Sequence, residues 1–444
     1  MEQTTRGNWG SQMGFILAAA GSAIGLGNIW RYPYITGQNG GAAFVLLYLA
    51  CVLVIALPVL IAELALGRRT TMNPVGAFQA LTTSKYWPFV GYLGVITGVG
   101  ILSFYLVVAG WTLGYIVKEL SGTIGSFGDF VQDPISEIGY FAAFLGLTVF
   151  VVLGGVEKGI ERWSKFLMPA LLILLLCLIG YNLTLEGASK GIEFYLNPDF
   201  SKINGSTFLA ALGQAFFSLS LGMGTMITYG SYLPKKENIP VGAVAVALSD
   251  TAIAFLAGLM IFPALFSVGL EPSQGPALVF NVLPSVFATM PGGQFIGIAF
   301  FILLAIAALT STVSLLEVPV AFLVDQKKWS RKKAVWIISG ATFLLGLPSA
   351  LAQGTSDFFS TLTLFGQTGF LDIMSFVFSD LSLPIGGFFI AIFVGWVWGA
   401  RHASEEILLG TPPAFSRLMA GWGFLIRFVC PAMILLVLIA KLFS

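Results

Sequence analysis

Two glycine-rich stretches decide the fold of this chain: Ala20-Gly-Ser-Ala-Ile-Gly-Leu-Gly-Asn28 and Phe217-Ser-Leu-Ser-Leu-Gly-Met-Gly-Thr225. Both lie inside apolar segments that are long enough to cross a membrane. Each glycine destabilises a helix interior by about 1 kcal/mol relative to alanine, so such clusters mark points where a helix can stop. A break there frees carbonyl oxygens that suit a small cation and N–H groups that suit an anion. Close helix packing is the alternative explanation, but the recurrence of the pattern favours a transport site.

The composition excludes a water-soluble protein. Of 444 residues, 57% are hydrophobic and 10% are charged, whereas about a quarter of the residues in a soluble domain are charged. Apolar segments of about 20 residues recur along the chain, as a bilayer core of about 30 Å requires. They predict eleven transmembrane helices, at about 11–36, 41–67, 87–119, 139–156, 163–185, 207–232, 240–270, 292–325, 333–352, 370–400 and 417–443. Because the alternating pattern of barrel strands is absent, we expect an all-α membrane protein.

The two glycine-rich stretches lie five spans apart, in spans 1 and 6. This spacing predicts an inverted five-plus-five helix repeat in which helices 1 and 6 are discontinuous. We expect a single transporter domain over residues 1–444, with a first repeat at about 11–185, a second repeat at about 207–400 and an accessory helix at about 417–443. The proline-rich segment from Glu271 to Gly293 is expected to fold back over an external vestibule.

The distribution of Lys and Arg predicts the orientation in the membrane. If the N-terminus is cytoplasmic, nearly all of these residues face the cytoplasm, and only Lys118, Lys190, Lys202 and Lys441 lie outside. We therefore expect a multi-pass protein of a bacterial-type inner (cytoplasmic) membrane whose C-terminus is extracellular. The net charge of +1 argues against nucleic acid as a partner.

Ionisable residues inside the spans are costly in lipid and therefore indicate function. They are Arg31, Glu63, Asp250, Glu317, Asp372, Asp380 and Arg427. Asp250 is isolated in span 7 and needs a cation, and Na⁺ prefers hard oxygen ligands of this kind. Pairing with Arg31 or Arg427 is the structural alternative. In span 8, Thr310 and Ser311 either bond to the preceding turn or complete a second cation site.

The sequence contains no recognisable catalytic centre. His402 is the only histidine, so histidines can build neither a zinc cluster nor a nucleophilic triad. A Walker-type loop is absent from the sequence, which excludes a self-contained ATP-driven pump. We expect no enzyme activity and no cofactor, with Na⁺ as the coupling ion.

Three longer motifs carry a family resemblance: Gly21-Ser-Ala-Ile-Gly-Leu-Gly-Asn-Ile-Trp-Arg-Tyr-Pro33, Gly154-Gly-Val-Glu-Lys-Gly-Ile-Glu-Arg162 and Gln214-Ala-Phe-Phe-Ser-Leu-Ser-Leu-Gly-Met-Gly224. They resemble the neurotransmitter:sodium symporters, especially their bacterial amino-acid transporters, over nearly the whole chain. The resemblance implies a sodium-coupled secondary symporter that imports hydrophobic L-amino acids, both aliphatic and aromatic, by alternating access. Members commonly have a twelfth span, and we expect transport without it because the ten-helix core is complete.

The resemblance also implies two sodium sites built from oxygen ligands. The first would use the Ala23 carbonyl, Asn28, Ser218 and Asp250, together with the carboxylate of the substrate. The second would use the carbonyls of Gly21, Ile24 and Ala307 and the hydroxyls of Thr310 and Ser311. Chloride-dependent members have Asn in place of Asp250, so the resemblance implies transport without chloride.

The substrate site implied by the resemblance lies between the two breaks. Its residues would be Ser22, Ala23, Gly25, Leu26, Gly27, Ile101, Tyr105, Phe217, Ser218, Ser220, Met223, Ser311 and Leu315. The substrate carboxylate would meet Tyr105 and the stretch Gly25–Gly27, where monoamine carriers have an aspartate in place of Gly25. The apolar lining selects an apolar side chain, and the flexible Met223 makes a tryptophan-sized one plausible.

Gates on both sides of the site are implied as well. Above it, Arg31 would pair with Asp372 or a neighbouring acid, and Tyr105 and Phe217 would form a thin lid. Below it, the gate would consist of Arg6, Asp325, Trp9 and Tyr232, with Arg6 paired to Asp325. Gly159 and Pro169 in span 5 resemble a family motif that unwinds to admit water to the second sodium site.

Two other functions remain open from the sequence. A proton-coupled transporter of the same fold would titrate Asp250 instead of holding Na⁺ there. A channel or substrate-sensing receptor on a transporter fold would bind ligand without exchanging it stoichiometrically.

Overall fold

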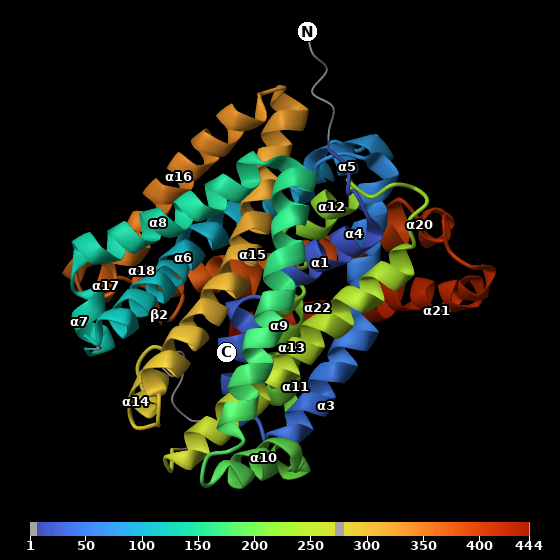
Figure 1. Ribbon diagram of the computed structural model, residues 1–444. Coiled ribbons are helices and arrows are strands. Elements are labelled where there is room, and N and C mark those ends of the chain that lie inside the picture. The colour runs from blue at the N-terminus through green and yellow to red at the C-terminus, as the bar shows by residue number, and fades with distance from the viewer. Residues whose placement is uncertain (1–6, 124, 271–278, 444) are drawn as a thin grey trace.

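The computed structural model describes residues 7–123, 125–270 and 279–443, and these residues are almost entirely helical (Figure 1). Up to residue 196, the α-helices are α1 (Gln12–Ala23), α2 (Tyr32–Gln38), α3 (Ala42–Cys51), α4 (Leu57–Thr70), α5 (Pro74–Leu81), α6 (Pro88–Ser121), α7 (Phe127–Val131), α8 (Pro134–Leu153), α9 (Arg162–Asn182) and α10 (Ala188–Leu196). The later helices are α11 (Gly205–Ser218), α12 (Thr225–Gly230), α13 (Ile239–Ser267), α14 (Val282–Ala288), α15 (Gly293–Lys327), α16 (Arg331–Leu351), α17 (Asp357–Thr361), α18 (Phe370–Ser375), α19 (Leu383–Ile392), α20 (Ala400–Ile407), α21 (Met419–Phe424) and α22 (Cys430–Phe443). Wider π-helical turns join or precede several of them at Gly27–Arg31, Val52–Ala56, Val156–Glu161, Phe376–Ser382, Phe393–Val397 and Leu425–Val429.

The helices support the expectation of a polytopic membrane protein. Among the described residues, nine continuous helical segments are long and apolar enough to cross a membrane, and one bent pair makes a tenth. The remaining predicted span, at 207–232, corresponds to α11 and α12, each too short to cross alone. The eleven-span count and the repeat therefore stay predictions.

One small hairpin departs from the all-helical expectation. Strands β1 (Thr363–Leu364) and β2 (Gln367–Thr368) pair antiparallel across a two-residue loop. Both loop residues, Phe365 and Gly366, have positive φ angles of 54° and 74°, as the tight primed turns of β-hairpins require. The hairpin connects α17 to α18 and does not alter the helical architecture.

The first glycine-rich stretch interrupts its helix where the sequence predicts. α1 ends at Ala23, and Ile24 adopts an extended conformation. Helical structure resumes in the π-helical turn Gly27–Arg31 and continues into α2, at an angle of 53° to α1. The backbone between the two halves is therefore released from the helical hydrogen-bond ladder in the interior of the molecule.

The second stretch interrupts its helix as well. α11 ends at Ser218, α12 begins at Thr225, and three residues between them have positive φ angles: Ser220 (54°), Gly222 (85°) and Gly224 (77°). The N–H group of Gly222 donates a hydrogen bond of 2.7 Å to Oε1 of Glu63 on α4. A buried carboxyl group from a neighbouring helix thus supports the non-helical backbone of this break.

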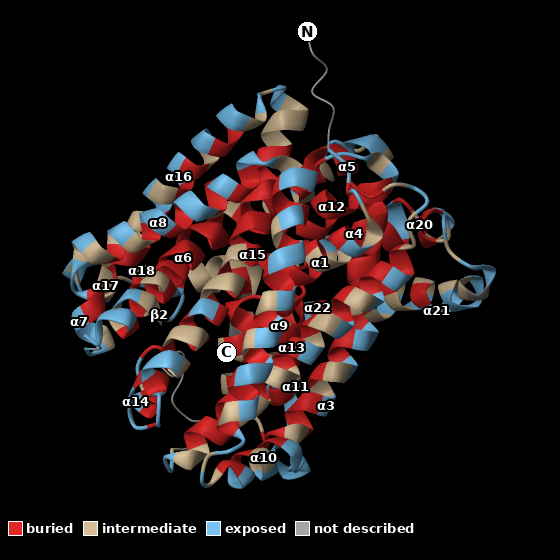
Figure 2. Cartoon of the chain, viewed as in Figure 1, coloured by how far each residue is buried: buried red, intermediate tan, exposed pale blue. Residues whose placement is uncertain are grey.

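The long helices pack around α1. α1 lies against α9, α13 and α15, and α15 also packs along α6 (Figure 1). Buried residues concentrate where these helices face one another, while α3, α8, α9 and α16 expose outward surfaces (Figure 2). Those surfaces carry large apolar side chains such as Phe150, Ile173 and Leu344, each more than 60% exposed. Exposed apolar area of this extent indicates contact with lipid.

We predict that Gly222→Ala destabilises the protein by about 1–3 kcal/mol, because a side chain is strained at positive φ. A Cβ there would also lie 2.1 Å from the carbonyl oxygen of Leu383. The apparent unfolding temperature of the detergent-purified protein measures the effect. Gly213→Ala is the matched control, because nothing lies within 4 Å of its Cβ position in α11. Equal unfolding temperatures for the two variants would contradict the packing described here.

Candidate functional site

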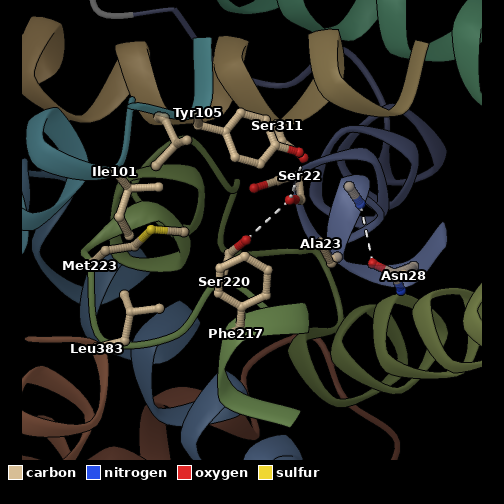
Figure 3. A pocket seen from close by; sticks show the side chains of 13 residues that line it. Ser22, Ala23, Asn28, Ile101, Tyr105, Phe217, Ser220, Met223, Ser311 and Leu383 are labelled. Atoms are coloured by element: carbon tan, nitrogen blue, oxygen red, sulfur yellow. Dashed lines mark hydrogen bonds between the residues drawn. The ribbon is translucent and has the colours of Figure 1, made fainter. Parts of the chain in front are cut away.

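A central cavity lies between the two helix breaks (Figure 3). Its volume is about 30 Å³, room for about two water molecules, so the lining side chains nearly fill the space between the breaks. Its lining residues are Ser22, Ala23, Gly25, Gly27, Asn28, Ile101, Tyr105, Phe217, Ser220, Met223, Ser311, Leu315 and Leu383. The structure thus brings together most of the substrate-binding residues implied by the resemblance, from spans 1, 3, 6 and 8.

Two members of the implied set lie beside the cavity instead of lining it. Leu26 faces a second, outer cavity, and its N–H group donates a hydrogen bond of 2.9 Å to the Tyr105 hydroxyl. Ser218 points away, toward Asp250. Conversely, Leu383 of α19 lines the cavity although nothing in the sequence pattern singled it out.

The polar end of the cavity is formed around Ser22, in the last turn of α1 before the first break. Its carbonyl oxygen accepts hydrogen bonds from the hydroxyls of Ser220, at 3.0 Å, and Ser311, at 3.3 Å. Its own hydroxyl donates to the Ser314 hydroxyl at 2.7 Å. Hydroxyls from span 6 and span 8 therefore converge on the interrupted backbone of span 1, as Figure 3 shows for Ser220 and Ser311.

Two glycines keep this polar end open. A Cβ at Gly25 would lie 2.7 Å from the Ser311 hydroxyl oxygen and 2.9 Å from the Tyr105 hydroxyl. A Cβ at Gly27 would lie 2.5 Å from the ring of Phe217. Any side chain at either position would occupy space at the N-terminal end of the outer half of span 1, where an anionic group is favoured.

A cluster of oxygen-bearing side chains surrounds Asp250, which is fully buried on α13. Asn28 Nδ2 donates to Asp250 Oδ1 at 2.7 Å. The Ser218 hydroxyl lies 2.9 and 2.8 Å from the two carboxylate oxygens, and the Tyr48 hydroxyl lies 3.3 Å from Oδ2. In the described part of the chain Asp250 has no ion-pair partner, and its surroundings are neutral hydrogen-bonding groups that fit a small, hard cation.

The structure contradicts the alternative in which Asp250 pairs with an arginine. Arg31 pairs with Asp380, and Arg427 Nε donates to the carbonyl oxygen of Gly395 at 3.0 Å. Tyr48 was missed by sequence reasoning, because a tyrosine in an apolar span gives no signal of its own. Only the folded structure, in which α3 packs against α11 and the Tyr48 hydroxyl reaches α13, reveals its contact with Asp250.

The residues of the second expected sodium site also lie together. A Cβ at Gly21 would lie 3.2 Å from Thr310 Cβ and 3.0 Å from the sulfur of Met168 on α9. The Thr310 hydroxyl bonds to the carbonyl of Ala307 at 3.0 Å, and the Ser311 hydroxyl crosses to span 1. Thr310 thus bonds to its own preceding turn and Ser311 does not. Both oxygens keep lone pairs that a cation can use.

The outer cavity lies next to the central one, and Tyr105 and Phe217 line both. Arg31 Nη2 lies 3.1 Å from Asp380 Oδ1, with both side chains partly exposed, and the Arg31 guanidinium lies 4.8 Å from the Phe217 ring centroid. Of the expected partners, Asp372 or a neighbouring acid, the structure pairs Arg31 with Asp380 and not with Asp372, although Asp372 lines the same cavity.

The π-helical turn Phe376–Ser382 explains the difference. It places Asp380 deeper along span 10, facing Arg31, whereas Asp372 lies in the first turn of α18. The expected covering loop is described only in part, because 271–278 fall outside the described residues. Within the described part, Phe280 lines the outer cavity and its carbonyl accepts a hydrogen bond of 2.7 Å from Tyr115.

The opposite side of the central cavity is packed with aromatic side chains. Trp9 Nε1 donates to the carbonyl of Tyr229 at 2.9 Å, and the ring centroids of Trp9 and Tyr232 lie 6.2 Å apart. The Tyr232 hydroxyl donates to Glu317 at 2.8 Å, and Glu317 also forms an ion pair with Arg331. The sequence places Arg331 just after span 8, at the first residue of α16, but gives no signal that its side chain reaches Glu317 inside α15.

Two further expectations concern the same side. Arg6 lies outside the described residues, so its pairing with Asp325 stays a prediction; Asp325 accepts a hydrogen bond of 2.9 Å from the Asn73 N–H group. Gly159 lies in the π-helical turn Val156–Glu161 at the start of span 5, and Pro169 lies inside α9.

Comparisons with known proteins agree with this geometry. The sequence profile of the "Sodium:neurotransmitter symporter family" matches residues 6–126 and 131–444. An uncharacterised sodium-dependent transporter of Bacillus subtilis, YhdH, is 40% identical over 97% of this chain and 96% of its own length. A sodium- and chloride-dependent GABA transporter of Homo sapiens, GABA transporter 2, is 26% identical over 98% of this chain and 80% of its own length.

A solved structure shares the fold over the full length. The crystal structure of MhsT in complex with L-phenylalanine superposes with a TM-score of 0.90 at 46% sequence identity, covering 98% of this chain and 100% of MhsT. The profile match, the bacterial relative and this structural match together show the family directly. The chain belongs to the sodium:neurotransmitter symporter family.

Proposed function

We propose that this protein is a sodium-coupled symporter that imports hydrophobic L-amino acids, aliphatic and aromatic, by alternating access and without chloride. Family membership supports sodium as the coupling ion and excludes an enzyme. The observation that carries the substrate class is the central cavity, whose polar end gathers hydroxyls and Asn28 and whose other end is apolar. Such a cavity suits a zwitterion with an apolar side chain. The L-phenylalanine bound in the structural relative supports the same class.

The proposed substrate pose follows from the two ends of the cavity. The carboxylate lies against Gly25, Leu26 and Gly27, where the outer half of span 1 begins and its N–H groups favour an anion. The Tyr105 hydroxyl, which accepts the Leu26 N–H group, turns its own proton toward this carboxylate. The amino group faces the carbonyl oxygens of Ala23, Phe217 and Ser218 and the side chain of Ser220.

Two sodium ions are proposed, with different roles. The first lies among the Ala23 carbonyl, Asn28, Ser218 and Asp250, and the substrate carboxylate completes its shell. Without this ion, the substrate would bring a second carboxylate close to Asp250, which like-charge repulsion disfavours in a buried site. Sodium binding and substrate binding are therefore coupled directly.

The second ion is proposed to lie between the carbonyls of Gly21, Ile24 and Ala307 and the hydroxyls of Thr310 and Ser311. It ties span 1 to span 8 on the side of the cavity near α9. Unwinding of span 5 at the motif formed by Gly159 and Pro169 would expose this ion to water, because Met168 packs against Gly21. Its release would let span 1 move.

The proposed arrangement in the membrane has eleven spans and an inverted five-plus-five repeat. The bias of Lys and Arg supports a cytoplasmic N-terminus, an extracellular C-terminus and a bacterial-type inner membrane. In this orientation the cavity lined by Arg31 and Asp380 faces outward, and the aromatic packing around Trp9 faces the cytoplasm. The inner gate is proposed to include Arg6 and Asp325 in addition to Trp9 and Tyr232.

Uptake into proteoliposomes tests the proposed function. We expect hydrophobic amino acids, from a panel of twenty, to compete for uptake driven by a sodium gradient, and neither a potassium gradient nor a pH gradient to replace sodium. Replacement of chloride by gluconate should leave uptake unchanged, because Asp250 supplies a fixed negative charge. Uptake driven by protons alone would support the proton-coupled alternative, and binding without counterflow would support a receptor or channel.

We predict that Asn28→Ala raises the half-saturating sodium concentration by about tenfold or more, since it removes a ligand and a hydrogen bond to a charged group. Asn39→Ala is the matched control just beyond the end of the same span, because the Asn39 side chain donates to the carbonyl of Ile35 one turn earlier in α2. Sodium-dependent binding of labelled substrate measures both variants. Wild-type sodium affinity in Asn28→Ala would show that the ligand assignment is wrong.

We predict that Asp380→Asn speeds dissociation of bound substrate to the outer side by about two- to fivefold, the size expected for a partly exposed ion pair. The Arg31 and Asp380 side chains are 29% and 23% exposed. Asp372→Asn removes a charge from the same cavity without touching this pair and should leave dissociation near the wild-type rate. A larger effect of Asp372→Asn would restore the pairing first expected from the sequence.

A further inference from the structure

The apolar end of the central cavity is formed by side chains from several spans, with Leu315 of α15 among them. Ile101 comes from α6, Met223 from the second break and Leu383 from the first turn of α19. Figure 3 shows these three on one side of the cavity and Ser22, Ala23 and Asn28 on the other. A substrate whose head group occupies the polar end therefore directs its side chain toward Leu383.

The backbone that carries Leu383 is held directly against the second break. A Cβ at Gly222 would lie 2.1 Å from the Leu383 carbonyl oxygen and 2.9 Å from the Gly387 nitrogen. A Cβ at Gly386 would lie 2.1 Å from the Gly222 carbonyl oxygen. Span 10 and the broken part of span 6 thus meet backbone to backbone, with no side chain between them that could yield.

Leu383 itself has little freedom to move. Its side chain is 1% exposed, and Pro384 fixes the direction of the chain immediately after it. Met223 also lines this end, but methionine has three rotatable side-chain bonds and adapts to different shapes. The two residues therefore differ in kind: Met223 can adjust to a substrate, whereas Leu383 limits the space.

We infer that Leu383 is a specificity-determining residue that sets the upper size limit of the substrate side chain. The inference rests on the proposed function and adds the residue that discriminates within the substrate class. Removing part of this wall should favour large aromatic side chains, and enlarging it should exclude them. Alanine as substrate should be affected least, because its methyl group does not reach Leu383 from the polar end.

The experiment measures how unlabelled alanine, leucine, phenylalanine and tryptophan inhibit sodium-driven uptake of labelled leucine into proteoliposomes. For Leu383→Ala, the half-inhibitory concentration of tryptophan relative to that of leucine should fall by about tenfold. A change of one or more methylene groups in an apolar pocket alters discrimination between substrates by at least about this factor. For Leu383→Phe, the same ratio should rise by about tenfold or more, with inhibition by alanine retained. Because Leu383→Phe is expected to shift this ratio in the opposite direction, it tests the inference even if Leu383→Ala folds poorly.

Leu381→Ala is the matched control, with the same substitution on the same span but outside the cavity lining. It should keep the wild-type order of inhibition. An unchanged tryptophan-to-leucine ratio in both Leu383 variants, or an equal shift in Leu381→Ala, would overturn the assignment while leaving the proposed function intact. Absence of sodium-driven uptake of all four amino acids by the wild-type protein would instead overturn the proposed function, and the inference with it.

Discussion

The site depends on backbone groups that two interrupted helices leave without helical partners inside an apolar molecule. Each such group needs another partner, because an unpaired peptide group in lipid is costly. Neighbouring spans provide them: Glu63 accepts the Gly222 N–H group, Tyr105 accepts the Leu26 N–H group, and Ser220 and Ser311 donate to the Ser22 carbonyl. The same contacts hold the two breaks in place, so the polar groups at this end of the cavity are positioned by the protein itself.

Asp250 adds a charge to this arrangement. Its partners Asn28, Ser218 and Tyr48 come from three other spans and are all neutral, so they orient the carboxylate without neutralising it. A cation satisfies this position better than a hydrogen bond does. Because Asn28 also belongs to the first break, an ion bound to Asp250 is connected to the backbone that would hold the substrate carboxylate. In the proposed mechanism, ion binding and substrate binding consequently depend on one small set of atoms.

Much of this could be predicted from the sequence, because the main signals are local. Glycine clusters in apolar spans indicated both breaks, since glycine acts on the backbone at its own position. The isolated Asp250 indicated a cation because the free-energy cost of a charged side chain inside the membrane depends on its own position there. The residues that the resemblance implied, such as Ser22, Tyr105 and Ser311, converge on the cavity because they lie in or beside these breaks.

The residues that escaped prediction depend on how helices face one another. Asp380 faces Arg31 because of a π-helical turn in span 10, and helical periodicity does not anticipate such a turn. Leu383 follows three residues later on the same segment and reaches the cavity from there. Since Leu383 and Gly386 contact Gly222 through backbone atoms, span 10 cannot shift relative to the second break without opening a gap or a clash. Asp380 of the outer ion pair and Leu383 of the apolar wall therefore lie on one segment, and the backbone of that segment is packed directly against the second break.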